Sequence, residues 1–258
     1  MVTLSKLVKK ALSPFGSRAG GGPERTAPGN GSRPSFYVPV GDCQVAELAT
    51  LYRIFLGERR HGFFVEVGAF DGVSCSNTSC LADVGWSGIL IEPVPAYAQA
   101  CRERYRGNDN IRIIQSAVGA SRSQIDIHVA GSLTTSSNRL MEAYRDISWA
   151  RSAAHESTTL TVQQQTLDEI LETAGAASPI DVLSVDVEGG EEAVFAGFTL
   201  ARWRPTLIII ELVHTHPDLH GISAGDAAIQ KMIERNGYSV VYKDAINTVF
   251  VADPPAAL

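Results

Sequence analysis

The sequence predicts an α/β fold built on one mostly parallel sheet with an antiparallel hairpin at its C-terminal end. Short apolar runs alternate with segments of helical periodicity, a pattern typical of parallel sheets covered by helices on both faces. The last two apolar runs, at 238–242 and 249–252, are joined by a short turn. They must pair antiparallel, because a parallel crossover needs at least about ten residues. A chain of 258 residues, 45% of them hydrophobic, suffices for the core of one such domain.

Helices and strands are expected in a regular order along this domain. The 3.6-residue periodicity predicts helices over 45–59, 78–84, 96–105, 166–172, 191–195 and 227–236. Short apolar runs predict strands over 63–67, 88–92, 111–115, 124–129, 160–165, 181–185, 207–211, 238–242 and 249–252.

Two segments depart from the alternation, one before the domain and one inside it. Residues 1–36 read as a basic amphipathic helix at 1–15 followed by a linker rich in Gly, Pro and Ser, so that the folded domain spans 37–258. Within the domain, 131–157 is a polar insertion rich in Ser, Thr and Arg. An insertion of this kind is the natural place for a lid over a substrate.

The N-terminal segment 1–15 places apolar side chains on one helix face and three lysines elsewhere. Such a helix favours weak peripheral contact with an anionic membrane or docking on a partner, while a frayed tail or a helix packed on the domain is the alternative. No apolar run has the ~18–20 residues of a membrane span, and no secretory signal is recognised. We therefore expect a cytoplasmic protein, with peripheral contact at the inner face of the membrane as an option.

Charge and cysteine content exclude several classes of protein. The net charge of −6 divides into +5 for residues 1–34 and −11 for the remainder. An acidic domain is unsuited to binding a phosphate backbone, so nucleic acid is not an expected partner. The four cysteines lack the paired short spacings of a zinc site, which agrees with a reducing compartment.

The segment 63–72 is the most informative part of the chain. A buried strand stops at Gly68, and the loop that follows carries Asp71 and Gly72, as expected where backbone approaches a ligand closely. The pattern is not G-x-G-x-x-G, and Glu66 and Asp71 would repel a pyrophosphate but attract a cation. The alternative is a glycine turn with two solvated acids.

Two further segments extend this candidate binding site. Glu92 ends the next strand 24 residues after Gly68, close to the spacing at which nucleotide-binding folds place an acid on ribose hydroxyls. Ser116 and Ala117 follow the third strand, where backbone and a small hydroxyl would contact an adenine edge. An adenosine that carries a positive group fits this description, and S-adenosylmethionine is the common ligand of that kind.

Acidic and imidazole side chains follow the later strands. Asp186 and Glu188 leave the carboxyl end of the fourth strand, where carboxylates would orient a hydroxyl, accept its proton or hold a divalent ion. Glu191 and Glu192 are interpreted as favourable charges at a helix N-terminus. His214 and His216 follow the fifth strand as candidate bases or as surface residues. No metal site is predicted, because the two histidines have no third neighbouring ligand.

Taken in order, these motifs resemble the FkbM family of S-adenosylmethionine-dependent methyltransferases. The similarity rests on EVGAFDG at 66–72, Ser76-Asn77-Thr78, Gly85-Trp86-Ser87-Gly88, Ile91-Glu92-Pro93, TLDEI at 166–170, DVEG at 186–189 and Ile210-Glu211. The resemblance implies a class I methyltransferase fold, which is Rossmann-like and has a seven-stranded sheet with an antiparallel C-terminal strand. It also implies O-methylation of sugars, glycolipids or natural products. The segments 1–36 and 131–157 lie outside the match.

The resulting hypothesis is an S-adenosylmethionine-dependent O-methyltransferase. The residues expected to bind the cofactor are Glu66, Gly68, Ala69, Asp71, Gly72, Asn77, Glu92, Ser116, Ala117 and Asp186. The residues expected to position the acceptor or take its proton are Asp186, Glu188 and His214. The alternatives are a non-catalytic binding module on the same fold and a nucleotide-dependent oxidoreductase, which would lack its phosphate-binding glycines.

Overall fold

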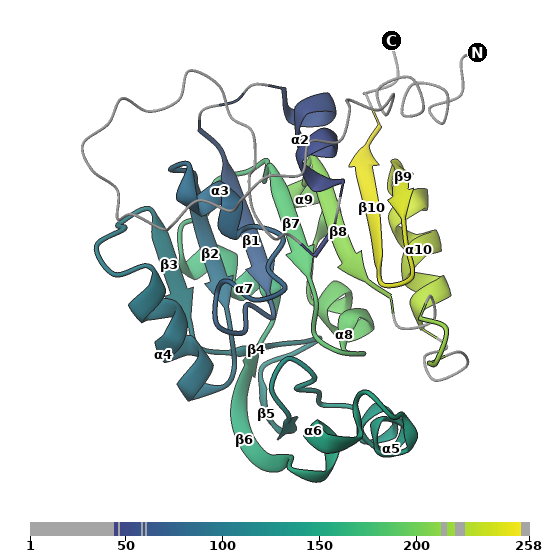
Figure 1. Ribbon diagram of the computed structural model, residues 1–258. Helices are drawn as coiled ribbons and strands as arrows, with labels where there is room; N and C mark the ends of the chain where they lie inside the picture. Colours follow the sequence, from purple (N-terminus) through teal and green to yellow (C-terminus); the bar gives the residue numbers. More distant parts are fainter. Residues whose placement is uncertain are drawn as a thin grey trace, which may run out of the picture.

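A seven-stranded sheet forms the centre of the protein (Figure 1). The computed structural model describes residues 44–45, 47–57, 59, 61–212, 216–219 and 225–253. The strands of this sheet are β1 (Phe63–Val67), β2 (Ser87–Ile91), β3 (Ile111–Ile114), β7 (Val182–Val185), β8 (Leu207–Glu211), β9 (Tyr238–Lys243) and β10 (Asn247–Ala252). Their order is β3-β2-β1-β7-β8-β10-β9, and β10 runs antiparallel to both of its neighbours. This arrangement confirms the predicted fold class.

The strands of the sheet are apolar because helices bury them from both sides. On one face pack α2 (Leu48–Leu56), α3 (Ser79–Asp83) and α4 (Pro95–Arg104). On the other pack α7 (Leu167–Thr173), α8 (Glu191–Ala196), α9 (Leu200–Trp203) and α10 (Asp226–Arg235). Every residue of β7 and of β8 is buried, so these strands have no polar face to expose.

The register of the parallel strands fixes which residues meet beyond the sheet. Val67 at the end of β1 pairs with Ile91 of β2 on one side and with Val185 of β7 on the other. Val185 in turn pairs with Ile210 of β8. Four consecutive strands of the sheet therefore end at nearly the same level, and the residues that follow them lie side by side.

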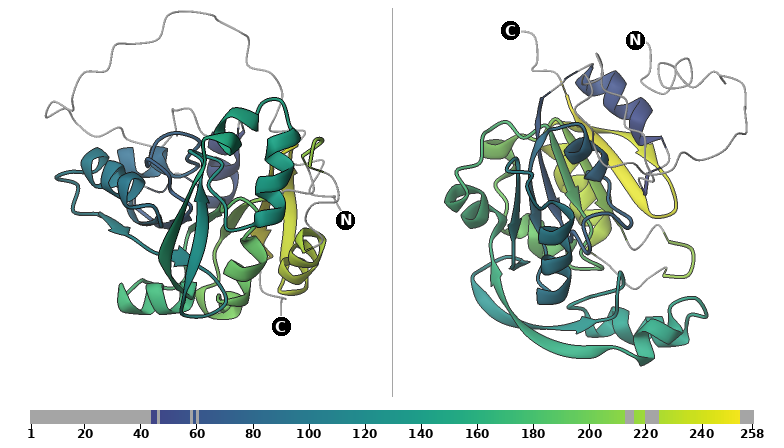
Figure 2. Two further views of the ribbon diagram at one scale, coloured as in Figure 1. Left: turned by 90° about the horizontal axis from the view of Figure 1, so that it is seen from below. Right: turned by 60° about the vertical axis from the view of Figure 1, so that its left-hand side comes forward.

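A second, three-stranded sheet forms an arm at the carboxyl ends of these strands. It consists of β4 (Ala117–Val118), β5 (Ser123–Val129) and β6 (Thr158–Gln165) in the order β4-β6-β5. The arm also carries α5 (Asn138–Asp146) and α6 (Arg151–His155) between β5 and β6. In Figure 1 the arm lies below the sheet, and the right-hand view of Figure 2 shows it curving beneath the strand ends.

The two helices of the arm have a small apolar core of their own. Leu140, Met141 and Tyr144 of α5 pack with Ala150 and with Leu219, which comes from the segment after β8. No helix was predicted in the polar insertion 131–157, because its apolar residues are few and are separated by charged ones. Three buried side chains on one face of α5 are nevertheless enough to hold it against α6 and residue 219.

The TLDEI motif braces the far side of the sheet. The Thr166 hydroxyl caps α7 by accepting a hydrogen bond from the Glu169 backbone N–H, and the Thr166 backbone N–H donates one to the Glu169 carboxylate. The Asp168 carboxylate accepts hydrogen bonds from Trp203 Nε1 at 2.8 Å and from both the backbone and the hydroxyl of Thr199. This motif therefore ties α7 to α9 and does not reach the strand ends.

Most predicted elements agree with those observed to within two or three residues, whereas β4, α5, α6 and α9 were not predicted. The predicted N-terminal helix and linker at 1–36 lie outside the described residues. Within the described part of the chain, no helix combines the length and the apolar character needed to cross a membrane.

Candidate active site

The main pocket of the described structure lies where the strand ends meet the arm. It is lined by Gly68, which follows β1, by Glu92, which follows β2, and by Asp186, which follows β7. Serine and threonine side chains of the arm form the opposite wall: Ser132, Thr134, Thr135 and Ser136. Ligands of open α/β sheets bind at the carboxyl ends of the strands, which is where this pocket lies.

Gly68 is required by the close approach of two strand ends. Its backbone has a φ of +86°, and a Cβ placed on it would lie 1.6 Å from the Asp186 carbonyl oxygen. Its N–H donates to the Ile91 carbonyl at 3.0 Å. A side chain at this position would therefore separate β1 from β7 at the mouth of the pocket.

Glu92 is a buried carboxylate directed into the pocket. Its two oxygens accept hydrogen bonds from the backbone N–H groups of Phe70, at 2.9 Å, and of Val94, at 2.8 Å. Burial nevertheless raises the pKa of Glu92 to about 7. Each carboxylate oxygen has a second lone pair, so the group remains able to accept hydrogen bonds from ribose hydroxyls. The rings of Phe70 and Tyr97, edge to face at 4.7 Å, line the pocket beside it.

The charge of the pocket suits a cationic ligand. Its described lining includes the carboxyl groups of Glu66, Glu92, Asp186 and Glu188 but no Lys, Arg or His side chain. A pyrophosphate would meet only like charge there, whereas a sulfonium would be attracted. The donor set therefore fits S-adenosylmethionine, with Glu92 placed for the ribose and the acidic wall placed for the positive sulfur.

Glu66 and Asn77 support the pocket wall. The Glu66 carboxylate accepts hydrogen bonds from the Ser76 hydroxyl, the Thr78 hydroxyl and the Asn77 backbone. Burial raises its pKa to about 7 in spite of these bonds. Asn77 Oδ1 accepts from the Val45 backbone at 2.9 Å. Both residues line the pocket, and their polar atoms hold the loop that follows β1.

The other predicted cofactor residues occupy different positions. Ala69, Ser116 and Ala117 line the pocket, although the Ser116 hydroxyl donates to the Ala117 carbonyl at 2.8 Å. Asp71 and Gly72 are not part of the lining. The Asp71 carboxylate closes a turn instead, because it accepts hydrogen bonds from the Val73 and Ser74 backbones and from the Ser74 hydroxyl.

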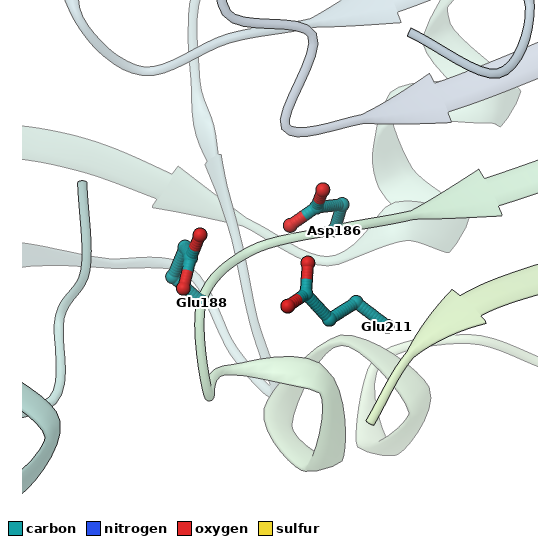
Figure 3. A group of neighbouring side chains, drawn as sticks. All are labelled: Asp186, Glu188 and Glu211. Carbon is teal, nitrogen blue, oxygen red and sulfur yellow. The ribbon is translucent and has the colours of Figure 1, made fainter. Parts of the chain in front are cut away.

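Three carboxyl groups come together where β7 and β8 end. One oxygen each from Asp186, Glu188 and Glu211 lies within 4.8 Å of the others, and Figure 3 shows the three groups pointing toward one another. Asp186 follows β7 and Glu211 ends β8, so the strand register brings them together. No metal site was predicted because the two histidines had no third neighbouring ligand, whereas this cluster offers three oxygen ligands.

Burial raises the pKa of all three carboxyl groups. The pKa values of Glu211 and Glu188 lie well above the usual range for glutamate, first because of burial and then because of the charge of Asp186. Glu211 donates a hydrogen bond to Asp186, whose own pKa is raised by burial and held down by this bond and by one from Gln44. Glu211 and Asp186 thus share a proton, because two buried carboxylates in contact cannot both ionise at neutral pH.

Glu188 is held from both ends in a strained conformation. Its backbone has a φ of 53°, a left-handed conformation that residues other than glycine rarely adopt. Its backbone carbonyl accepts a hydrogen bond from the Thr135 hydroxyl at 2.6 Å, and its carboxylate accepts one from the Tyr144 hydroxyl. Both donors belong to the arm, so the insertion fixes the direction in which Glu188 points.

Several residues of the site were missed or undervalued by sequence reasoning. Glu191 is fully buried and accepts hydrogen bonds from the backbones of Val187 and Gly189, so it shapes the loop around Glu188 as well as favouring the start of α8. The Gln44 side chain donates a hydrogen bond to Asp186, and its Oε1 accepts one from Asn247 Nδ2 at 3.1 Å. No sequence pattern indicates Tyr144 or Gln44. Glu211 could have been found, because it is an acid at the end of an apolar strand.

Among the described residues, the carboxyl cluster does not include His216. His214 lies outside the described residues. The ring of His216 lies 5.2 Å from that of Trp149 between the centroids, and its Nδ1 accepts a hydrogen bond from the Asp218 backbone.

Two solved structures similar to this chain share little of its sequence. Similar solved structures include precorrin-6y C5,15-methyltransferase from Geobacter metallireducens, at 11% identity and a TM-score of 0.41 over 80% of this chain and 87% of that one. Another is the fibrillarin pre-rRNA processing protein of Methanococcus jannaschii, at 14% identity and a TM-score of 0.41 over 76% and 68% of the two chains. No curated protein matches the sequence significantly.

A family model decides the relationship. The methyltransferase FkbM domain matches residues 66–240, a span that begins at the end of β1 and includes the arm, the carboxyl cluster and most of the sheet. This favours methyl transfer over a nucleotide-dependent oxidoreductase. The chain belongs to the FkbM methyltransferase family, and its seven-stranded sheet with an antiparallel C-terminal strand agrees with the class I methyltransferase fold that the family implies.

Proposed function

We propose that the protein transfers a methyl group from S-adenosylmethionine to a hydroxyl of a sugar, glycolipid or natural product. The observation that carries this proposal is Glu188, a buried carboxylate that Thr135 and Tyr144 hold in a strained conformation beside the pocket. Strained residues cluster at functional sites, where the surrounding structure holds them in place. A carboxylate with a raised pKa is also suited to accept a proton from a hydroxyl near neutral pH.

Residues of the pocket divide into a cofactor side and an acceptor side. Glu92 would hold the ribose, and the glycine at the end of β1 leaves room for close approach of the ligand. When bound, S-adenosylmethionine supplies a methyl group whose sulfur leaving group is already activated. The protein therefore has mainly to hold the acceptor oxygen about 3 Å from the methyl carbon and in line with the carbon–sulfur bond.

The carboxyl cluster supplies the proton chemistry. Glu188 accepts the hydroxyl proton as the oxygen attacks, and the Tyr144 hydroxyl stabilises the ionised form of Glu188. Asp186 retains the charge that it shares with Glu211 and attracts the cationic centre. The serine and threonine hydroxyls of the arm offer donors and acceptors to the acceptor molecule.

The decisive experiment detects both transfer and the role of Glu188. Purified protein is incubated with methyl-labelled S-adenosylmethionine and with glycan, glycolipid and small-metabolite fractions, and label in a fraction is measured with formation of S-adenosylhomocysteine. We expect one hydroxylated fraction to gain label with the wild type, at least ~100-fold less with Glu188→Gln, and an unchanged amount with Glu192→Gln. Glu192 is an exposed residue of α8 and serves as the matched control.

Two results would contradict the proposal. Binding of S-adenosylmethionine without label in any fraction would instead identify a non-catalytic binding module. Activity that EDTA removes and Mg²⁺ restores would assign the carboxyl cluster to a metal and overturn the role of Glu188 as the proton acceptor.

The N-terminal sequence adds a proposal about where the acceptor is presented. Three lysines and an apolar helix face within residues 1–15 would give weak contact with anionic lipid at the inner face of the membrane. Lipid-linked acceptors would then be favoured over free ones. Wild type and a variant lacking residues 1–35 are compared for binding to vesicles with and without anionic lipid. Equal partitioning of the two proteins would remove this argument.

A further inference from the structure

Trp149 is an exposed aromatic side chain of the arm, between α5 and α6. The chain has three tryptophans, of which Trp86 and Trp203 are buried at 1% and 3% exposure, whereas Trp149 is 49% exposed. Single exposed apolar residues are common on protein surfaces and need no explanation by themselves. The contacts of Trp149 distinguish it from such residues.

The indole ring of Trp149 is fixed in place by three neighbours. Its Nε1 donates a hydrogen bond to Asp218 Oδ2 at 2.9 Å. The ring of Tyr144 lies 6.0 Å away between centroids and that of His216 lies 5.2 Å away, both tilted. An aromatic ring held in one orientation can bind a ligand with little loss of conformational entropy. The exposed ring is therefore a preorganised surface.

This surface is linked to the carboxyl cluster through the buried side chain of Tyr144. Tyr144, which contacts the Trp149 ring, also donates its hydroxyl hydrogen bond to the Glu188 carboxylate. The partners of Trp149 come from two places, because α5 supplies Tyr144 and the segment after β8 supplies His216 and Asp218. Leu219 anchors that segment in the small apolar core of the arm. One tyrosine thus separates the exposed indole from the proposed proton acceptor.

The surroundings of the surface indicate the chemistry of its ligand. The arm wall of the pocket presents hydroxyls, and the described pocket lining has four carboxyl groups but no Lys, Arg or His. A sugar ring has an apolar C–H face that packs on an aromatic ring, and hydroxyls at its edge that pair with serine and threonine. A carboxylate or phosphate on that sugar would meet like charge without a basic partner.

We propose that Trp149 is the platform on which an uncharged sugar ring of the acceptor stacks, and that the acidic pocket rejects phosphorylated and carboxylated sugars. This inference rests on the proposed methyl transfer to a hydroxyl, and it narrows the acceptor to neutral glycosides. Trp149 acts here as a specificity-determining residue.

The test uses the fluorescence of the exposed tryptophan, which does not depend on turnover. Acrylamide quenches exposed indoles, so quenching of the full-length protein reports mainly on Trp149. With S-adenosylhomocysteine bound, we expect a neutral methyl glycoside from a panel of gluco, galacto, manno and rhamno forms to protect the protein from quenching. Methyl β-glucuronide, which differs from methyl β-glucoside only by its carboxylate, should bind at least about tenfold more weakly than the best neutral glycoside.

Variants separate the platform from the catalytic step. Trp149→Ala should raise KM for the labelled acceptor at least about tenfold with kcat within about twofold, and Trp149→Phe should restore most of the affinity. Ile54→Ala, at the other exposed large apolar residue of the described structure, is the control and should change neither constant.

The possible results distinguish failure of the Trp149 platform from failure of the proposed methyl transfer. Protection by no neutral glycoside, equal protection by the glucuronide, or an unchanged KM in Trp149→Ala would each overturn this inference. Protection by a neutral glycoside without methyl transfer would leave the platform in place and overturn the proposed function instead.

Discussion

The hydrogen bond between Tyr144 and Glu188 gives a quantitative test of the proposed proton acceptor. Tyr144 is buried, and its hydroxyl donates to the Glu188 carboxylate. Burial and the charge of Asp186 raise the pKa of Glu188, while the bond from Tyr144 lowers it. Tyr144→Phe removes the hydroxyl and keeps the ring, so it deletes the one influence in this set that favours the ionised carboxylate.

The expected shift follows from the strength of the lost bond. Hydrogen bonds to charged groups contribute about 1.5–3 kcal/mol, and one pKa unit corresponds to about 1.4 kcal/mol. The pKa of Glu188 should therefore rise by about one to two units in Tyr144→Phe. Because only the ionised carboxylate accepts a proton, kcat/KM below that pKa should fall about tenfold for each unit.

The assay is the pH dependence of kcat/KM for the wild type and for Tyr144→Phe. The acidic limb of the profile should move to higher pH by about one to two units, with little change above it. Tyr238→Phe is the matched control, because Tyr238 is also buried and its hydroxyl donates to the Pro205 carbonyl at 2.9 Å, away from the pocket. A profile that Tyr144→Phe lowers equally at every pH would show that the bond serves structure and not proton transfer.

Two further predictions concern cofactor charge and fold stability. Glu66 and Glu92 have pKa values raised to about 7, and a nearby positive charge lowers such values; binding of S-adenosylmethionine at pH 7 should therefore release more protons than binding of the uncharged-sulfur product, as measured by calorimetry in buffers of different ionisation enthalpy. Equal proton release by the two ligands would contradict the placement of the sulfonium beside these carboxyl groups. Asp168→Ala removes the acceptor for Thr199 and Trp203 and should lower the free energy of unfolding by about 3 kcal/mol, with cofactor affinity unchanged. Glu172→Ala removes an exposed pair with Arg202 and should lower the free energy of unfolding by less than about 1 kcal/mol. Both variants are measured by denaturant unfolding, and a similar loss of free energy in both would refute the role of Asp168 in joining α7 to α9.

The central sheet could be predicted because burial on both faces leaves a strong local signal. Strands such as β7 and β8 are short, wholly buried and mostly apolar, and the helices between the strands of the sheet have clear periodicity. The antiparallel end of the sheet followed from the length of one turn. The pattern does not contain the strand order, so the position of β10 between β8 and β9 was not predicted. The family resemblance implied only seven strands with an antiparallel C-terminal strand.

The site was predictable where a functional residue follows a strand directly. Gly68, Glu92 and Asp186 each occupy such a position, and the register of β1, β2 and β7 brings them together. Tyr144 could not be found in this way. It is 44 residues from Glu188 along the chain, and only the packing of α5 in the arm places its hydroxyl at the carboxylate.

The acidic composition of the domain acquires a physical role at this site. Glu66, Glu92, Asp186, Glu188 and Glu211 all have raised pKa values, first of all because they are buried. A protein holds so many carboxyl groups in one place only if several remain protonated or a cation joins them. Methyl transfer converts a sulfonium into an uncharged thioether, which removes the positive charge that favoured ionisation. The carboxyl groups should then rebind protons and hold the product less tightly than the substrate cofactor, so the burial that raises their pKa values would also favour product release.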